Sequence, residues 1–168
     1  PKLDLKRLVD DLCRRGLHPP LLLRFNDILH SRIRRLADSF QDSIERYEYQ
    51  SGYQSLMPIK VNQQRHVVEE VINQPPQYQM GLEAGSKPEL LIAMGLLGAG
   101  NNIIVCNGYK DSEYIETVFD AQRLGLKPFI VIDRFAELDL ILQAAKKTGM
   151  VPNLGIRARL TARGSGRW

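Results

Sequence analysis

The sequence predicts an α/β fold whose consecutive βα units build a parallel sheet. From residue 53 onwards, short apolar runs alternate strictly with amphipathic helical patterns, at a repeat of about 25 residues. The apolar runs are hydrophobic on both faces, as in strands that helices cover. None of them is followed by a GxGxxG turn, which favours a (β/α) barrel of the TIM type over an open dinucleotide-binding sheet.

Composition excludes several other classes of protein. The 168 residues are 43% hydrophobic and 25% charged, which is ordinary for a soluble globular protein. The net charge of +4 comes from scattered basic residues, so we expect no nucleic-acid partner. No apolar run approaches the roughly 20 residues of a membrane span, and the start of the chain lacks a signal-peptide pattern. We therefore expect no membrane partner.

The two cysteines bear on the compartment and on metal binding. Cys13 and Cys106 lie far apart in the sequence, and neither belongs to a CxxC pair. This favours a reducing, cytoplasmic compartment over a disulfide scaffold. We expect no metal site built from these residues.

Residues 1–26 are predicted to form a helix and a strand ahead of the repeating part. Leucines and a valine at helical spacing cover residues 2–15, and Gly16 fits the end of that helix. Pro19 and Pro20 then require extended backbone. The apolar run 21–25 predicts a buried strand. A long amphipathic helix follows, which Asn26 or Asp27 can cap.

The repeating part contains five predicted strands, at residues 53–59, 79–84, 102–106, 129–132 and 153–160. Ser86-Lys87-Pro88-Glu89 forms a capping-box pattern at the start of one helix. Asp111 or Ser112 is expected to cap the next helix, and Asp133 the one after it. The predicted inward-facing positions include Leu90, Leu91, Met94 and Leu97 in the first of these helices, and Phe135, Leu138, Ile141, Leu142 and Ala145 in the last.

In a (β/α) barrel, function collects at the carboxyl ends of the strands. The first such residue is Lys60, between a hydrophobic strand end and a helix start. Burial there favours the neutral amine that forms a Schiff base. The alternative, a solvated loop lysine, is the commoner case at a βα junction. Glu83 is placed in the centre of the sheet, where a carboxylate needs a partner.

The other strand ends carry residues with simpler explanations. Ser86 and Asp133 are interpreted first as helix caps, and Asn107 as a turn residue. Arg157 and Arg159 lie two residues apart on a predicted strand and so share a face. Two arginines on one buried face indicate an anionic ligand.

Four motifs in collinear order carry a family resemblance, which runs from about residue 21 to residue 168. They are PIKVNQ at 58–63, GLEAGSKPELL at 81–91, VCNGYKDSEYI at 105–115, and GIRARL with GSGRW at 155–160 and 164–168. Together they resemble the biosynthetic arginine decarboxylases, pyridoxal-phosphate-dependent enzymes of the alanine-racemase-like barrel class. GLEAGSKPELL is the longest and most specific of the four.

The resemblance implies roles for individual residues. Lys60 matches the lysine that holds pyridoxal 5′-phosphate through a Schiff base. Glu83 matches an acidic position that helps to bind the cofactor, with its carboxylate paired to the pyridinium nitrogen. Ser86 and Arg157 complete the implied cofactor-binding set, while Arg159 matches only the arginine-decarboxylase subgroup and receives no role. A Mg²⁺ requirement is implied by the family alone.

The resemblance also implies how the chain is divided. Residues 27–168 correspond to the N-terminal part of a truncated barrel, about its first five βα units, and residues 1–26 belong with an adjoining β domain. Met57 and Arg167 depart from the family, which usually has an aromatic residue and a lysine there. The family's phosphate-binding glycine loop and its histidine stacked on the cofactor ring would lie beyond residue 168.

The function so implied is conversion of L-arginine to agmatine and CO₂ in polyamine biosynthesis, by a full-length enzyme that is a homo-oligomer, dimer or tetramer. Other decarboxylases of this class, acting on ornithine, diaminopimelate or carboxyspermidine, remain alternatives. So does a non-catalytic pyridoxal-phosphate-binding module or an inert truncated product. We expect the isolated segment to be inactive and poorly soluble, because its last strand would leave an unpaired sheet edge.

Overall fold

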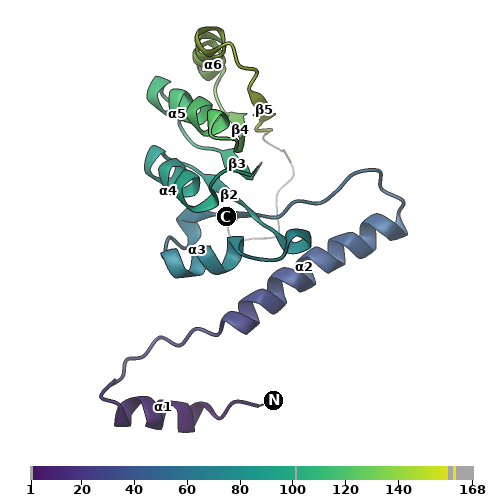
Figure 1. The fold of residues 1–168 in the computed structure, drawn as a ribbon. Helices are drawn as coiled ribbons and strands as arrows, with labels where there is room; N and C mark the ends of the chain where they lie inside the picture. Colours follow the sequence, from purple (N-terminus) through teal and green to yellow (C-terminus); the bar gives the residue numbers. More distant parts are fainter. Residues whose placement is uncertain (1, 101, 159–160, 162–168) are drawn as a thin grey trace.

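A parallel five-stranded sheet forms the centre of the computed structural model, which describes residues 2–100, 102–158 and 161 (Figure 1). Its strands are β1 (Leu56–Pro58), β2 (Gly81–Ala84), β3 (Ile103–Cys106), β4 (Lys127–Ile132) and β5 (Asn153–Ile156). They lie in the sheet in chain order, and each pairs in parallel with the next. This confirms the predicted succession of βα units.

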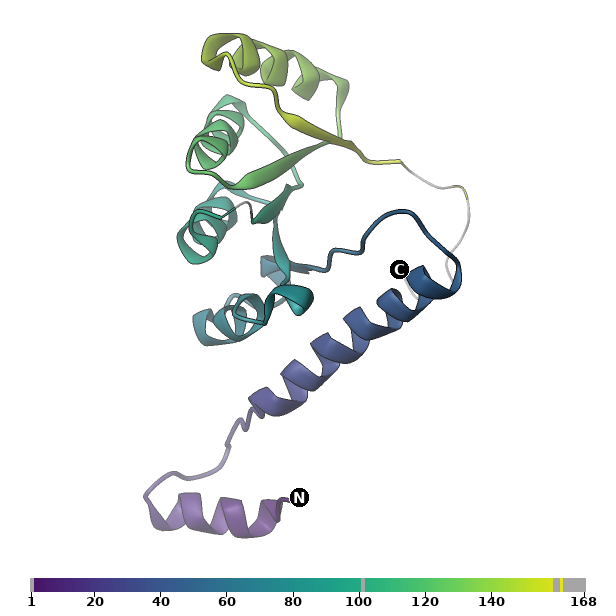
Figure 2. The ribbon, with the colours of Figure 1, turned by 45° about the vertical axis from the view of Figure 1, so that its right-hand side comes forward.

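Helices connect the strands and cover one face of the sheet. The helical elements are α1 (Leu5–Arg14), α2 (Asn26–Arg46), η1 (Ile59–Val61), α3 (Arg65–Ile72), η2 (Pro76–Tyr78), α4 (Lys87–Leu97), α5 (Ser112–Arg123) and α6 (Phe135–Thr148). Both ribbon views show α3 to α6 stacked side by side along this face (Figures 1 and 2). None of the described helices is long and apolar enough to cross a membrane.

The core lies between the sheet and these helices. Its fully buried members come from the strands and from the helices: Leu82, Ala84, Ile104, Cys106 and Ile130, and Val68, Leu90, Ala93, Tyr114, Ile115, Val118, Phe119 and Ile141. Burying such a side chain stabilises the fold by about 1.5–3 kcal/mol relative to leaving it exposed. The strands are short, so their pairing depends on this packing.

Three predicted inward positions are wrong. Leu91 is 59% exposed, Phe135 is 94% exposed and Leu142 is 55% exposed. In α4 the buried residues are Leu90 and Ala93, three positions apart, so the helix turns Leu91 out of the contact with the sheet. Phe135 is the first residue of α6, ahead of the part that packs on the core.

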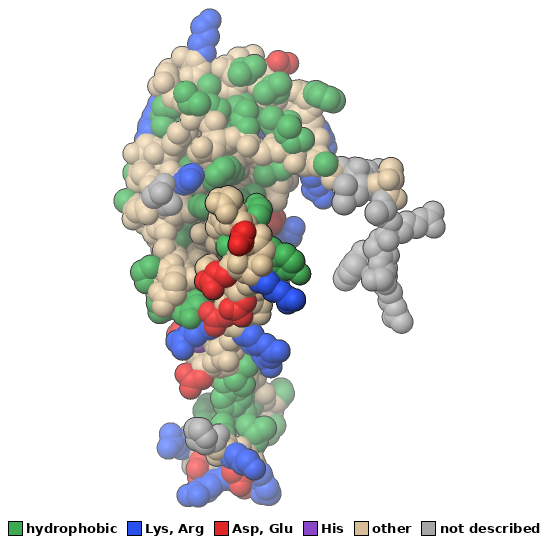
Figure 3. Space-filling model, turned by 90° about the vertical axis from the view of Figure 1, so that its right-hand side faces the viewer, with side chains coloured by type: hydrophobic (Ala, Val, Ile, Leu, Met, Phe, Trp, Pro, Cys, Tyr) green, Lys and Arg blue, Asp and Glu red, His purple; other side chains and the backbone are tan. Residues whose placement is uncertain are grey.

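The opposite face of the sheet carries no helix in the described part of the chain, as expected for the inward face of a partial barrel. Figure 3 looks onto this side and shows hydrophobic side chains gathered over its upper part. Leu154 and Ile156 of the edge strand β5 are among the exposed large hydrophobic residues. Poor solubility of the isolated segment, which such an exposed apolar edge would favour, stays a prediction.

The N-terminal region lies apart from the sheet (Figures 1 and 2). Residues 21–25 are extended but form no strand with any described residue, so the predicted strand is absent here. A strand needs a partner ladder, and an apolar run alone does not supply one. Polar contacts instead join the start of α2 to α3. Asn26 donates a hydrogen bond of 2.8 Å to Glu70, and His30 Nε2 lies 2.7 Å from the same carboxylate. Assignment of residues 1–26 to an adjoining β domain stays a prediction.

Candidate functional site

The carboxyl ends of the five strands surround an open cavity of about 680 Å³. Its lining residues are Lys60, Glu83, Gly85, Glu89, Asn107, Gly108, Val131, Ile156, Arg157 and Ala158. They come from the ends of the strands and from the segments that follow them, including the turn η1 with Lys60 and the first turn of α4 with Glu89. Three of the four predicted site residues, Lys60, Glu83 and Arg157, therefore meet in one place, where barrel enzymes carry their chemistry.

Lys60 lies in the single 3₁₀ turn that directly follows β1. Its neighbour Ile59 is fully buried and anchors this turn to the core. The Lys60 side chain itself is 64% exposed, and its Nζ lies 3.6 Å from Glu83 Oε1. The expected dry surroundings of Lys60 are thus absent from the described structure, because the turn carries its side chain to the rim of the cavity.

Glu83 has the partner that its position in the sheet requires. It lies in β2, level with Pro58 of β1 and Val105 of β3, and its side chain is only 17% exposed. The next carbonyl, that of Ala84, accepts hydrogen bonds of 2.9 Å from the Asn107 N–H and from the Tyr114 hydroxyl. These two bonds fix the end of β2 and hold Glu83 towards Lys60.

Ser86 is a helix cap, and Glu89 takes the place next to the cavity. The Ser86 hydroxyl accepts the Glu89 N–H at 3.5 Å, at the start of α4. Glu89 does not return the bond to Ser86, as a full capping box would, because its Oε2 accepts the Gly85 N–H at 2.7 Å. Ser86 is not among the described lining residues, whereas Glu89 is. Glu89 was not predicted as a site residue, because its place in the Ser86–Glu89 capping pattern already explains it.

Gly108 brings two of the loops into close contact. Its φ of +77° lies in the left-handed region, and a Cβ there would lie 2.3 Å from the Gly85 carbonyl oxygen. Only glycine satisfies both conditions at once. The loop after β3 therefore rests directly on the loop after β2, and both line the cavity.

Arg157 follows β5 and has a carboxylate nearby. Its backbone N–H donates to the Ile132 carbonyl at 3.2 Å, and its Nε lies 3.9 Å from Asp133 Oδ1. The side chain is 65% exposed, so the expected buried face is absent. Arg157 lies just past the end of β5, at the rim of the sheet. Arg159, its predicted companion, lies outside the described residues.

Asp133 is not the cap that its sequence position suggested. Arg134 occupies the N-cap position of α6 and makes no side-chain capping bond. The Asp133 N–H instead donates a hydrogen bond of 3.0 Å to Oε2 of Glu137, which lies in the first turn of α6. This leaves the Asp133 carboxylate facing Arg157.

Cys106, at the end of β3, is not a candidate nucleophile. Burial raises the pKa of its thiol to about 12, and neither the hydrogen bond with Tyr114 nor the charge of Lys110 offsets this. The thiol therefore stays protonated near neutral pH. Of the groups in and around the cavity, the Lys60 amine remains as the candidate nucleophile. No group of three or more His, Cys, Asp or Glu suited to a metal ion occurs among the described residues.

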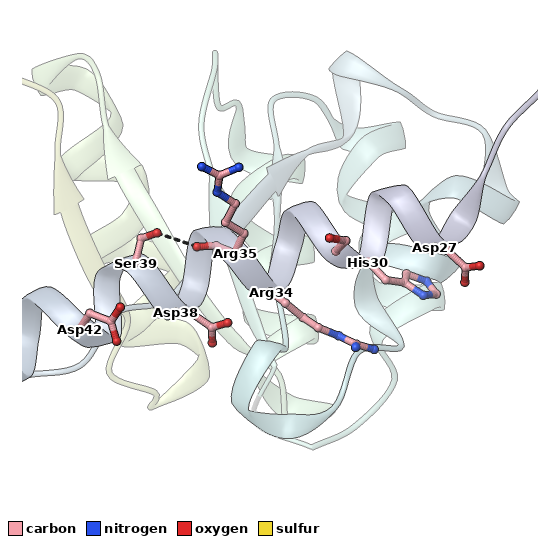
Figure 4. A pocket seen from close by; sticks show the side chains of 8 residues that line it. Asp27, His30, Arg34, Arg35, Asp38, Ser39 and Asp42 are labelled. Carbon is pink, nitrogen blue, oxygen red and sulfur yellow. Dashed lines mark hydrogen bonds between the residues drawn. The ribbon is translucent and has the colours of Figure 1, made fainter. Parts of the chain in front are cut away.

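A second hollow, of about 540 Å³, lies along α2 (Figure 4). Its described lining consists of Asp27, His30, Ser31, Arg34, Arg35, Asp38, Ser39 and Asp42. All of these belong to one helix, whose charges alternate in sign, and the labelled side chains in Figure 4 spread along it. Ser39 donates to the Arg35 carbonyl within the helix, at 2.7 Å. This is a solvated helix face, in which no set of groups converges on a ligand.

Known proteins resemble this chain over the part that contains the cavity at the strand ends. Residues 30–167 match the family model described as pyridoxal-dependent decarboxylase, pyridoxal binding domain. The chain is 57% identical over 167 residues to the biosynthetic arginine decarboxylase of Gloeobacter violaceus. This match covers 99% of this chain and 26% of that protein. The corresponding enzyme of a Nostoc species is 49% identical, with 99% of this chain and 24% of that protein covered.

A solved structure gives the same result. The crystal structure of the biosynthetic arginine decarboxylase from Campylobacter jejuni superposes with a TM-score of 0.86 at 33% identity. The match covers 95% of this chain and 27% of that one. The chain thus spans about a quarter of the length of the relatives that it matches.

Proposed function

Because the chain belongs to the pyridoxal-dependent decarboxylase family through its pyridoxal-binding domain, we propose that it forms the cofactor-binding part of an arginine decarboxylase. The reaction is conversion of L-arginine to agmatine and CO₂. One observation carries the proposal: the Lys60 amine and the Glu83 carboxylate meet, 3.6 Å apart, in a cavity at the carboxyl ends of parallel strands.

The residues of this cavity fit pyridoxal phosphate. A primary amine at the rim suits an aldehyde, and the guanidinium of Arg157 suits an anionic group. The carboxylates of Glu83 and Glu89 suit a cationic ring nitrogen or an ammonium group. When bound, the cofactor supplies an electron sink for the pair of electrons left by the departing CO₂.

Each side chain has a proposed task. Lys60 would present the amine that holds the aldehyde of the cofactor. Glu83 orients the Lys60 Nζ, which is the role that its 3.6 Å contact supports. Pairing of Glu83 with the ring nitrogen stays a prediction from the family resemblance. Arg157, kept near Asp133, offers positive charge at the opposite rim. Ser86 contributes by capping α4 and so fixing the loop that contains Gly85.

Arginine is the proposed substrate because the relatives of this chain are named as arginine decarboxylases. The direct test supplies the full-length enzyme with L-arginine, L-ornithine, L-lysine and diaminopimelate in parallel and measures released CO₂. We expect arginine to be preferred by its kcat/KM. Preference for another of these substrates would keep the family and overturn the substrate.

Assembly and location complete the proposal. We expect the full-length enzyme to be a dimer or tetramer of identical chains, which analytical ultracentrifugation measures directly. A reducing cytoplasmic setting is supported by Cys13 and Cys106, both of which are free thiols. A Mg²⁺ requirement is tested by measuring turnover after chelation with EDTA.

A further inference from the structure

A buried ion pair lies behind the cavity and belongs to none of the roles above. Lys110 is 1% exposed and Glu137 is 2% exposed, and the Lys110 Nζ lies 3.1 Å from Glu137 Oε2. In the described part of the chain, the only other buried polar residue is Gln74. Burying two charges carries a desolvation cost that their attraction seldom exceeds by much. Stability alone therefore does not account for the pair.

The hydrogen bonds of the pair reach the backbone of two loops. The Lys110 Nζ donates to the Gly108 carbonyl at 2.6 Å, within the loop after β3. Glu137 accepts the Lys110 N–H at 3.4 Å through Oε1 and the Asp133 N–H at 3.0 Å through Oε2. The pair thus joins the loop after β3 to the turn after β4.

Both joined segments end at cavity residues. Gly108 lines the cavity and rests against the Gly85 carbonyl, so the loop cannot move towards β2 without a clash. Asp133 lies 3.9 Å from the guanidinium of Arg157, which lines the opposite side. A shift of either loop would change the distance between the two sides of the site.

We propose that Lys110 and Glu137 are positioning residues: their buried pair sets the spacing between the Gly108 loop and the Asp133 turn, and so the shape of the cofactor site. The role depends on the cofactor site proposed above, but the loop contacts themselves do not. Neither side chain lines the cavity in the described structure. Both act through Gly108, Asp133 and Arg157.

The test uses the double variant Lys110→Met with Glu137→Leu in the full-length enzyme. Removing both charges avoids a buried unpaired ion, and apolar replacement of a buried pair is often neutral or stabilising. The matched control is Lys147→Met. Its 2.8 Å pair with Glu116 joins α6 to α5, the two helices that follow these loops, but its side chain is 74% exposed and lies away from the cavity.

Two measurements are made. The first is hydrogen exchange in the cofactor-free protein, where we expect about tenfold faster exchange at residues 107–111 and 133–137 in the double variant, with the β2 and β4 amides unchanged. The second is the dissociation constant of pyridoxal phosphate, followed by its visible absorbance. We expect it to rise about tenfold, whereas the control keeps wild-type values in both measurements.

The outcomes separate the two proposals. Unchanged exchange in both segments overturns the positioning role, whether or not the cofactor binds. Faster exchange with unchanged cofactor affinity also overturns it, since the loops would then move without affecting the site. If the wild-type enzyme itself binds no pyridoxal phosphate, the proposed function fails and the positioning role, which needs that site, fails with it. The single variant Glu137→Gln keeps one acceptor oxygen for the loop amides. We therefore expect its exchange at residues 107–111 and 133–137 to be slower than in the double variant and faster than in the wild type.

Discussion

Two lysine–glutamate pairs lie near the same edge of the sheet and differ in almost every physical respect. Lys60 and Glu83 face the cavity at 3.6 Å, with the lysine side chain 64% exposed. Lys110 and Glu137 are enclosed at 3.1 Å, with the lysine side chain 0% exposed and the glutamate 3%. The first pair has few contacts that hold it, and the second also bonds three backbone groups.

This difference in exposure suits two different roles, a reactive group and a structural contact. An amine that must form and break a covalent bond needs access to its reaction partner, and the open pair provides it. A pair that fixes two loops needs the opposite, because a dry, fully bonded site has one arrangement of low energy. On the proposed function, the same two residue types serve the reactive site and the scaffold around it.

The largest expected effect is on turnover at the open pair. We expect Lys60→Met in the full-length enzyme to lower kcat by about 10³-fold or more, because no other amine lines the cavity among the described residues. Its stability should change by no more than about 1 kcal/mol, as for other exposed ion pairs. CO₂ release and urea unfolding measure the two quantities, and Lys147→Met serves as the control. Substantial turnover in Lys60→Met would remove Lys60 from the reaction.

At the enclosed pair, Lys110 and Glu137, we expect the main effect on stability rather than on turnover. Lys110→Met leaves the Glu137 carboxylate buried without its charge partner, so we expect a loss of about 3–5 kcal/mol in the free energy of unfolding. Urea unfolding of this variant beside Lys60→Met gives the comparison directly. Equal losses in the two variants would show that the difference in burial has no energetic consequence.

The contact between Gly108 and the Gly85 carbonyl provides a third test of how the loops are held in place. Gly108→Ala forces an alanine into the left-handed region and places its Cβ against the Gly85 carbonyl oxygen, so we expect a loss of about 2–4 kcal/mol. Gly149→Ala is the matched control. Its φ of +68° carries the same backbone strain, but nothing lies within 4 Å of its Cβ position. If both variants lose equal stability, the Gly85–Gly108 contact does not constrain the loops.

The smallest expected effect is the acid response of the enclosed pair. Burial alone would raise the pKa of Glu137, but the bonds from the Asp133 N–H and from Lys110, with the lysine charge, hold that pKa below its ordinary 4.5. A lowered folded-state pKa means that this stabilisation is complete above about pH 4.5 and declines as the pH falls through the folded-state value.

Unfolding free energies measured from pH 6 to pH 3 should therefore fall more steeply in the wild type than in Glu137→Gln, which has no such titration. Parallel curves for the two proteins would contradict the lowered pKa of Glu137.

Much of the fold could be predicted from the sequence because it depends on local patterns. Alternating apolar runs and helical stripes locate all five strands of the described sheet, and their carboxyl ends locate Lys60, Glu83 and Arg157. Residues 21–25 show the limit of this reasoning. Their composition suits a strand, but pairing depends on a partner that the pattern does not contain.

The enclosed pair could not be predicted at all. Lys110 and Glu137 are separated by 27 residues and carry no shared motif, and each alone resembles a solvated charge. Only the packing of the loop after β3 against α6 brings them together. The exposure of Lys60 was mispredicted for a related reason, since strand hydrophobicity does not reveal that a 3₁₀ turn follows Pro58.

The most direct test of the account is to reduce the full-length enzyme with borohydride in the presence of pyridoxal phosphate and to map the labelled peptide by mass spectrometry. We expect the label on Lys60, and we expect Lys60→Met to lose it. A label on another lysine, such as Lys87 or Lys110, or an unlabelled enzyme that still releases CO₂ from arginine, would contradict the central role given to the open pair.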